Sequence, residues 1–505
     1  MFRKSQLHTQ INMFSSIGMM LMCEREQEFF DDKNAWHNVF NKNFTSLVDE
    51  SIFEPMYKAN GMGAPTASIR ILVAMCVLKE GLKLSDERLN EACGYNLLVR
   101  RALGLDDLSV ACPSLDTYYC FRRRIVEYER EYGVNLLSEC CQDVTRRQTK
   151  AFRLKGSHLR MDSKLVCSNI AFYTRYRNVH ACFCKGVTPA DLACLKSTNQ
   201  TAYHRAQDLL QEDAEKTIYT SNTEELQGRM LDLGYLIYDI LRNRPERVED
   251  ILQRVFDEQF VIGEDTQLTI LDGKKVSSDS IQNPNDEEAS YRKKGNQVVR
   301  GYVTNITETV DEENAPNLIT DVQVAPATAS DNAFVKDAIE QTEAITENKV
   351  ERIYADGAYH SAENQELGVE LVLTGLTGFP ARYSIERVDG EVHIVDTQTG
   401  EEMEVTRNRN GDKWRIRTEN GYQYFTESDI QKQEVRRMAA AVPWELKKKR
   451  NNVEATIYHY AQCLEKNKSR YRGLLKLKMQ AWAQCSWINL VRIVNFILRQ
   501  ELQLA

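Results

Sequence analysis

"KVERIYADGAYHS", residues 349–361, carries one aspartate at the point where a short, mostly apolar run gives way to a glycine. The run before Asp356 has the composition of a buried strand. A carboxylate at the end of such a strand is costly to bury unless an arginine, a set of backbone amides or a metal ion meets it. Asp356 is therefore a candidate functional residue, and the alternative is an Asx turn that only prepares the turn at Gly357.

A second aspartate, Asp162, lies in another predicted strand, "KGSHLRMDSKLV", residues 155–166. Two alternating segments, a predicted helix and the strand of Asp356 follow it along the chain, and this order predicts an α/β layer. If the strands of Asp162 and Asp356 are parallel neighbours, the two carboxylates meet and repel each other. Mg²⁺ would relieve the repulsion, because it prefers oxygen ligands. The alternative for Asp162 is a turn residue at the end of its strand.

The remaining chain divides into helical, β-rich and basic segments. Helical patterns fill residues 65–148 and 186–260, Gly390, Gly411 and Gly421 mark hairpin turns between short polar strands, and two apolar stripes at helical spacing follow. The predicted fold is an α/β catalytic core with an all-α N-terminal domain, a helical insertion and a β-rich insertion. The predicted boundaries are 1–150 for the N-terminal domain, 151–185 with 265–378 for the first part of the core, 186–264 for the helical insertion, 379–430 for the β-rich insertion and 431–505 for the basic C-terminal helices of the core.

The composition is that of a folded globular protein. Apolar residues make up 42% and charged residues 27% of the 505 residues, and the apolar run at 71–78 is far too short to cross a bilayer. The thirteen cysteines include no C-x-x-C pair, which argues against a disulfide framework and against a four-cysteine zinc site. His180, Cys182 and Cys184 could begin a metal site, but the sequence has no second cluster to complete it.

Positive charge is concentrated at the end of the sequence. Residues 431–505 hold fifteen Lys and Arg against five Glu and no Asp, a local charge of +10 in a chain whose net charge is −8. Such asymmetry suggests that one face meets a polyanion, and a solvated helical surface explains it equally well. Arg122, Arg123 and Arg124 lie beside two tyrosines on a predicted helix. They would suit a phosphate backbone, although part of this cluster should be core at helical spacing.

Several blocks of sequence, taken in their order along the chain, resemble those of a known protein family. They are "RMDSKLV" (160–166), "NPNDEEASYRKKGNQVVRGYVTNI" (283–306) with "VAPATASDN" (324–332), "YADGAYHS" (354–361) and "RNNVEATIYHYAQCLEKNKSRYRG" (450–473). Together they resemble the successive blocks of DDE transposases of bacterial insertion sequences. Residues 63–81 and 95–105 are similar to the N-terminal helical region of that family, so the resemblance covers nearly the whole chain. It implies that the core is an RNase H-like catalytic domain.

The resemblance implies a role for three acids and one arginine. Asp162, Asp356 and Glu454 match the catalytic acids of the family and are implied to be ligands of two Mg²⁺ ions, with Mn²⁺ as a possible substitute. Arg450 stands four residues before Glu454, as in the related signature. At this spacing both side chains share a helix face, so Arg450 could hold a phosphate beside the metal. The structural alternative for Glu454 is a helix-face partner of Arg450.

The sequence departs from the related signature at two positions. The signature has a tyrosine three residues before the arginine and a lysine seven residues after the glutamate, where this chain has Lys447 and Ala461. Other basic residues are predicted to make the flanking phosphate contacts, namely Lys447, Lys448, Lys466, Arg470 and Arg472. Trp414, in the predicted β-rich insertion, is a candidate for stacking on a displaced base or, with better odds, a core residue of that small domain.

The implied activity is DNA transposition. The resemblance implies a bacterial cytoplasmic enzyme, without a membrane partner, that binds the terminal inverted repeats of its element and target DNA as a homodimer. It would hydrolyse DNA to expose 3′-hydroxyls and use them in strand transfer. Two alternatives stay open: an RNase H-like nuclease that cuts without joining, and a DNA-binding regulator derived from a transposase whose acids are structural.

Overall fold

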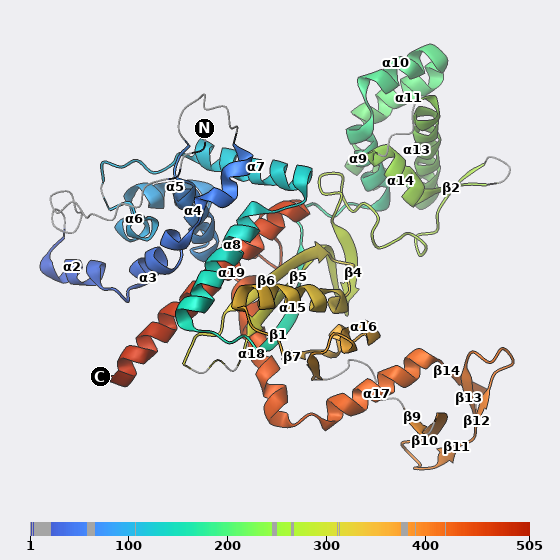
Figure 1. The fold of residues 1–505 in the computed structure, drawn as a ribbon. Helices are drawn as coiled ribbons and strands as arrows, with labels where there is room; N and C mark the ends of the chain where they lie inside the picture. The colour runs from blue at the N-terminus through green and yellow to red at the C-terminus, as the bar shows by residue number, and fades with distance from the viewer. Residues whose placement is uncertain are drawn as a thin grey trace.

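The computed structural model describes residues 2, 4, 22–57, 66–106, 108–244, 250–263, 267–310, 312, 314–374, 382–388, 390–419 and 421–504. The chain is a mixed α/β protein, as the sequence predicts. A mixed sheet lies at the centre, helices of the N-terminal region lie on one side, and two smaller units project from the other side (Figure 1).

Six strands form the central sheet in the described part of the chain: β1 (His158–Cys167), β4 (Ser290–Lys294), β5 (Gln297–Thr309), β6 (Ile319–Pro326), β7 (Arg352–Ala355) and β8 (Glu370–Leu373). The order across the sheet is β6-β5-β1-β7-β8, and β4 pairs with the beginning of β5 on the edge that β6 continues. Strand β5 pairs antiparallel with both β6 and β1, whereas β1, β7 and β8 run parallel to one another.

The end of β1 and the middle of β5 approach each other closely at Gly301. This glycine pairs with Cys167 of β1 on one side and with Ser290 of β4 on the other. A Cβ atom at this position would lie 2.3 Å from the carbonyl oxygen of Val166. The absence of a side chain at Gly301 therefore allows β1 and β4 to flank β5 at the same point.

Helices cover both faces of the sheet: α15 (Val335–Thr346) with the short η3 (Asp331–Phe334), η4 (Gly357–Tyr359) and α16 (Ala362–Gln365), and later in the chain α17 (Glu427–Ala441), α18 (Trp444–Ala461) and α19 (Leu474–Leu504). Side chains alternate between the two faces along each strand. Leu159, Met161 and Val303 pack under α15. Tyr302 and Ile306 point to the opposite face and pack with residues of α18 and α19.

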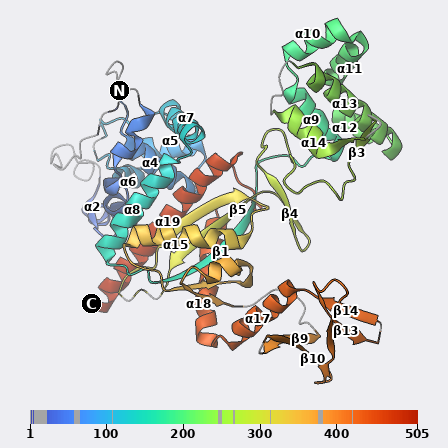
Figure 2. The same cartoon turned by 45° about the vertical axis from the view of Figure 1, so that its right-hand side comes forward.

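The N-terminal region is helical: α2 (Glu24–Asp31), α3 (Trp36–Asn43), η1 (Thr45–Leu47), η2 (Glu50–Met56), α4 (Ile69–Gly81), α5 (Asp86–Tyr95), α6 (Leu97–Leu103), α7 (Leu115–Tyr132) and α8 (Leu136–Phe152). The long helix α19 runs between these helices and the sheet in both views, and it contacts α3, α4 and α8 as well as β6 (Figures 1 and 2). One hydrophobic core therefore joins the N-terminal helices to the sheet. Among the described residues, each helix is too short or too polar to cross a membrane.

The first projecting unit, which we call the helical unit, comprises α9 (Arg175–Gly186), α10 (Pro189–Thr198), α11 (Gln200–Gln211), α12 (Ala214–Thr220), α13 (Thr223–Asn243) and α14 (Ile251–Gln259), with β2 (Phe260–Ile262) and β3 (Leu268–Ile270). It has its own core, to which Leu236, Ile237 and Ile240 contribute. Val179 and Phe183 of α9 belong to the same core, so the helical unit includes residues before 186.

The second projecting unit, which we call the β-rich unit, comprises β9 (Tyr383–Val388), β10 (Glu391–Asp396), β11 (Glu402–Met403), β12 (Val405–Arg407), β13 (Trp414–Thr418) and β14 (Gly421–Phe425). These strands form two three-stranded antiparallel sheets around a separate small core. Both views show the helical unit and the β-rich unit as separate lobes on the side away from the N-terminal helices (Figures 1 and 2).

Candidate active site

The two aspartates lie at matching positions on the parallel strands β1 and β7. His158 pairs with Arg352 and Arg160 pairs with Tyr354. Two residues further along each strand, the same register places Asp162 beside Asp356, which directly follows β7. Antiparallel pairing would have separated them, so the parallel direction of these two strands brings the acids together.

Each aspartate has one oxygen held by a main-chain N–H and the other directed at the same arginine. Oδ1 of Asp162 accepts a hydrogen bond from the N–H of Ser163 (2.9 Å), and Oδ2 lies 3.2 Å from Nη2 of Arg450. Oδ1 of Asp356 accepts from the N–H of Ala358 (2.5 Å), and Oδ2 lies 3.9 Å from the same Nη2. Burial raises the pKa of the Asp162 carboxyl, and Arg450 offsets only part of this effect.

The glutamate approaches the arginine from the other side of the guanidinium. Oε1 of Glu454 lies 4.0 Å from Nη1 of Arg450, one helical turn away on α18. The Glu454 side chain is 68% exposed, whereas the Asp162 and Arg450 side chains are 19% and 16% exposed. The structure thus brings the three predicted acids together around one guanidinium, with the glutamate at the solvent side.

A buried ion cluster fixes helix α18 against the sheet. Glu308 of β5 is completely buried and forms ion pairs with Arg160 of β1 and Arg492 of α19. Thr456 of α18 donates a hydrogen bond to Glu308 (2.7 Å). Burial opposes ionisation of Glu308, yet Arg492 and Arg160 together lower its pKa. Sequence reasoning missed this cluster, although Arg160 stands two residues before Asp162 on the same face of β1.

The cluster reaches the candidate site through the main chain. Nη1 of Arg160 donates a hydrogen bond to the carbonyl oxygen of Lys449 (3.2 Å), the residue directly before Arg450. One turn of α18 is therefore tied to β1 immediately next to the guanidinium that meets the three acids. We conclude that Arg160 and Glu308 set the position of Arg450 relative to Asp162.

The donor atoms at this site are suited to a hard cation. Asp162 and Asp356 already direct one oxygen each toward a shared positive group, and carboxylate oxygens are preferred ligands of Mg²⁺. Within the described ranges, however, no group of three or more His, Cys, Asp or Glu side chains is arranged as a ready metal site. At the predicted "HACFC" cluster, His180 instead contacts the carbonyl oxygen of Leu209 (2.8 Å).

The predicted basic residues of the C-terminal region occupy three kinds of position. Lys447 and Lys448 lie on α18 in the turn before Arg450, and the Lys448 ammonium sits 5.5 Å from the ring centroid of Trp444. Arg470 and Arg472 donate hydrogen bonds to the main-chain carbonyls of other segments, at 2.7 Å in each case. Lys466 lies at an exposed turn after α18.

The predicted N-terminal arginines differ in their surroundings. The Arg122 guanidinium stacks over Tyr118 and Tyr471, at 5.3 and 4.9 Å from the ring centroids, and its side chain is 16% exposed. Arg123 is 67% exposed and pairs with Glu127 on its own helix. Arg124 is exposed, and its guanidinium lies 4.9 Å from the ring centroid of Tyr57.

Trp414 lies in the core of the β-rich unit and is 9% exposed, the position that the structural alternative describes. The Arg407 guanidinium lies 4.6 Å from its ring centroid and the Arg387 guanidinium lies 5.8 Å away.

Comparison with protein families finds a match in the N-terminal region. Residues 28–124 match a family model described as Transposase domain (DUF772). The match spans the helical N-terminal region from α2 into α7 and supports a transposase family for this chain. No curated protein matches the sequence. No solved structure matches it either.

Proposed function

We propose that the chain is a DDE-type DNA transposase that cuts DNA at the ends of an insertion sequence and joins the exposed 3′-hydroxyls to target DNA. The observation that carries the proposal is the convergence of Asp162, Asp356 and Glu454 on the guanidinium of Arg450. These residues come from segments far apart in the sequence. A structural role for each acid alone would not require them to meet.

We propose further that the central sheet is an RNase H-like core. Its three antiparallel strands β6, β5 and β1 are followed by the parallel strands β7 and β8, and this order places Asp162 and Asp356 on neighbouring parallel strands. The match of residues 28–124 to a transposase family model supports the broader proposal of a transposase, from a part of the chain outside the sheet.

Each residue of the candidate site would have a separate role in the reaction of a phosphodiester. The N–H groups of Ser163 and Ala358 orient the two aspartates, so that one oxygen of each is available to a ligand. Asp162 and Asp356 would hold Mg²⁺, with Glu454 as the third ligand. Bound Mg²⁺ would activate the attacking water or 3′-hydroxyl and stabilise the leaving oxygen. Arg450 would contact the non-bridging oxygens of the phosphate through charge-assisted hydrogen bonds.

An assay of cleavage and joining on DNA that carries the inverted repeats of the element tests the proposal. Inverted repeats are first sought beside the reading frame, and a linear DNA that ends in them is incubated with the protein, Mg²⁺ and a supercoiled target plasmid. Cleavage at the repeat ends followed by joined products is expected. Cleavage without joining would replace the proposal with a nuclease. Metal-independent binding without any cleavage would replace it with a DNA-binding regulator.

The proposal includes assembly on DNA as at least a dimer, because two element ends must react in one complex. Light scattering of the protein with end DNA should give a mass of two or more protomers. A single protomer in the complex that carries out joining would remove this part of the proposal.

A further inference from the structure

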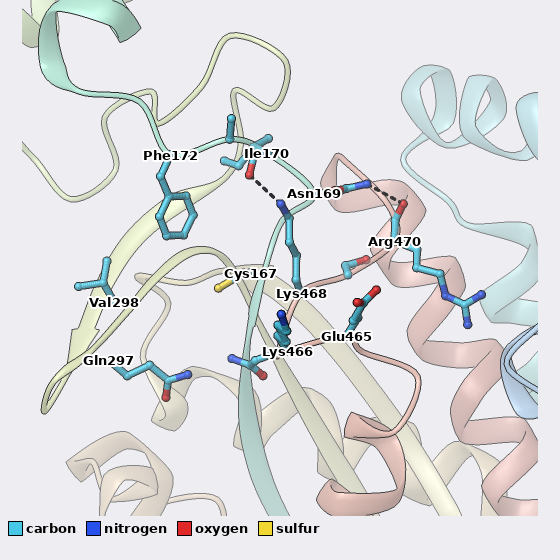
Figure 3. Close-up of a pocket in the computed structure, with 13 residues that line it drawn as sticks. Cys167, Asn169, Ile170, Phe172, Gln297, Val298, Glu465, Lys466, Lys468 and Arg470 are labelled. Carbon is cyan, nitrogen blue, oxygen red and sulfur yellow. Dashed lines mark hydrogen bonds between the residues drawn. The ribbon is translucent and has the colours of Figure 1, made fainter. Parts of the chain in front are cut away.

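A cavity of about 710 Å³ opens at the end of β1, beyond the candidate active site (Figure 3). Its walls are formed by residues 167–172, which follow β1, by the start of β5 at Gln297 and Val298, and by the turn at 465–470. This volume lies in the range of pockets that hold small ligands. The cavity shares none of its lining residues with the three acids.

The turn that forms one wall is tightly built and carries two cationic side chains and an amide in sequence. Glu465 and Lys468 exchange main-chain hydrogen bonds of 3.1 and 2.9 Å, which leaves Lys466 and Asn467 at the tip. Both have left-handed backbones, with φ of 50° and 63°, a region that lysine rarely adopts. Hydrogen bonds between this turn and Cys167, at 2.9 and 2.8 Å, hold it against the end of β1.

An aromatic ring forms a second wall. Phe172 is 52% exposed, and the guanidinium of Arg300 lies 4.8 Å from its ring centroid. Arg300 is itself held by a hydrogen bond to the carbonyl oxygen of Tyr173 (3.0 Å). Figure 3 shows the Phe172 ring directed toward the cavity beside Val298. The cavity thus contains the exposed ring of Phe172, and the guanidinium of Arg300 lies against this ring.

Polar side chains of the turn form the rest of the lining. Lys468 and Arg470 are engaged with the carbonyl oxygens of Ile170 and Leu84. Lys466, in contrast, is exposed at the cavity rim. The cavity therefore offers a stacking surface and a cation.

We propose that this cavity binds one unpaired nucleotide of the DNA substrate. The base would stack on Phe172, and its phosphate would contact Lys466. Stacking on an aromatic side chain and a nearby positive charge are the usual means of holding unpaired nucleotides. The inference rests on the proposed function, because it takes DNA as the substrate.

The strand β1 relates this cavity to the candidate active site. Cys167 lies five residues after Asp162 on the same strand, and at about 3.3 Å per residue the separation is about 16 Å. Successive phosphates of one strand in duplex DNA are spaced by about 3.4 Å along the helix axis. For a DNA axis that runs along β1, the bound nucleotide would lie about five steps from the phosphodiester that is cut.

Binding of two short duplexes tests the inference. They are identical except for a single unpaired thymine in one of them, and fluorescence anisotropy measures their affinities without added metal. The wild-type protein should bind the duplex with the unpaired thymine roughly tenfold more tightly, since stacking of one base has an effect of this size. Phe172→Ala should remove the difference and Phe172→Tyr should keep it.

Two further variants make the test specific. Lys466→Gly removes the cation, and glycine tolerates the left-handed backbone, so it should reduce the preference without loss of thermal stability. Tyr219→Ala removes a 91% exposed aromatic of the helical unit and should change nothing. Equal affinities of the wild type for both duplexes, or a preference that survives Phe172→Ala, would overturn the inference even if metal-dependent cleavage is observed. A protein that binds neither duplex would overturn both this inference and the proposed function.

Discussion

The Nη2 atom of Arg450 lies 3.2 Å from Oδ2 of Asp162, and the same atom approaches Asp356. The guanidinium therefore stands where a divalent cation bound to these acids would balance their charge. Arg450→Ala should leave Mn²⁺ binding intact or tighter, because a competing positive charge is removed. Cleavage should nevertheless fall, because a phosphate contact is lost. Calorimetric titration with Mn²⁺ and a cleavage assay on the same preparation check both parts, and loss of Mn²⁺ binding would contradict the first.

Replacement of the aspartates should separate stability from chemistry. Asp162→Asn and Asp356→Asn keep the shape of the side chain and remove its charge, so cleavage should fall by at least about a hundredfold. Asp162→Asn should melt at the same or a higher temperature, because burial disfavours the charged form of Asp162 in the folded protein. Asp337→Asn, an exposed aspartate on α15, is the control. A cleavage-competent Asp356→Asn protein would refute the proposed mechanism.

The buried Asp321 should make stability depend on pH. Burial raises its pKa from 3.8 to about 7, and Gln323 donates a hydrogen bond to it (2.7 Å) that offsets only part of this effect. The folded chain then binds a proton that the unfolded chain releases, so stability from this group is present below the ordinary pKa and is lost as the pH rises through about 7.

The variant Asp321→Asn isolates this effect. Relative to Asp321→Asn, the wild type should lose about 2–3 kcal/mol of unfolding free energy between pH 5 and 8. Urea unfolding at both pH values measures the difference, with Asp208→Asn, which changes an exposed aspartate on α11, as the control. Parallel pH profiles for the wild type and Asp321→Asn would show that Asp321 is ionised in the folded protein at pH 5.

Removal of the Glu308 charge should destabilise the core. Glu308→Gln leaves Arg160 and Arg492 in a buried site without their anion, a change that typically costs about 3–5 kcal/mol. Glu340→Gln, which breaks an exposed pair with Lys336 on α15, should cost less than about 1 kcal/mol. Denaturant unfolding compares the two variants. Equal small effects would mean that the Glu308 cluster contributes little to stability.

DNA binding should weaken steeply with salt. The C-terminal region carries a local charge of +10 in an acidic chain, and each phosphate contact should lower the logarithm of affinity by ~0.9 per unit of log salt. Anisotropy titrations across a range of KCl concentrations measure this slope. Lys448→Ala should reduce it by about one contact. An affinity that is nearly flat with salt would exclude phosphate contacts as the main source of binding.

Much of the fold and of the candidate site could be predicted from local patterns in the sequence. The apolar run before Asp356, the strand of Asp162 and the order of elements between them indicate an α/β layer, and the structure places the two acids in register on neighbouring strands. The helical spacing of Arg450 and Glu454 likewise fixes their common face on α18. These are short-range regularities, which a sequence displays directly.

Partners that are far apart in the sequence could not be anticipated in the same way. The neighbours of Glu308 in β5 are polar, so Glu308 resembles an exposed strand residue. In the structure, however, Arg492 of α19 forms an ion pair with it. Arg122 belongs to a basic run that suits a surface, yet it stacks on Tyr471, far along the chain. In both cases the burial of a charge is decided by a segment that local periodicity does not reveal.

The late position of α18 and α19 in the chain has a consequence for biosynthesis. The sheet and the N-terminal helices leave the ribosome before the helix that joins them, so the apolar faces later covered by α19 stay open in the nascent chain. Arg450 and Glu454 also arrive after both aspartates have been translated. Nascent chains that stop before α18 would therefore lack the grouped acids and expose core surface, and chaperones and proteases would act on them.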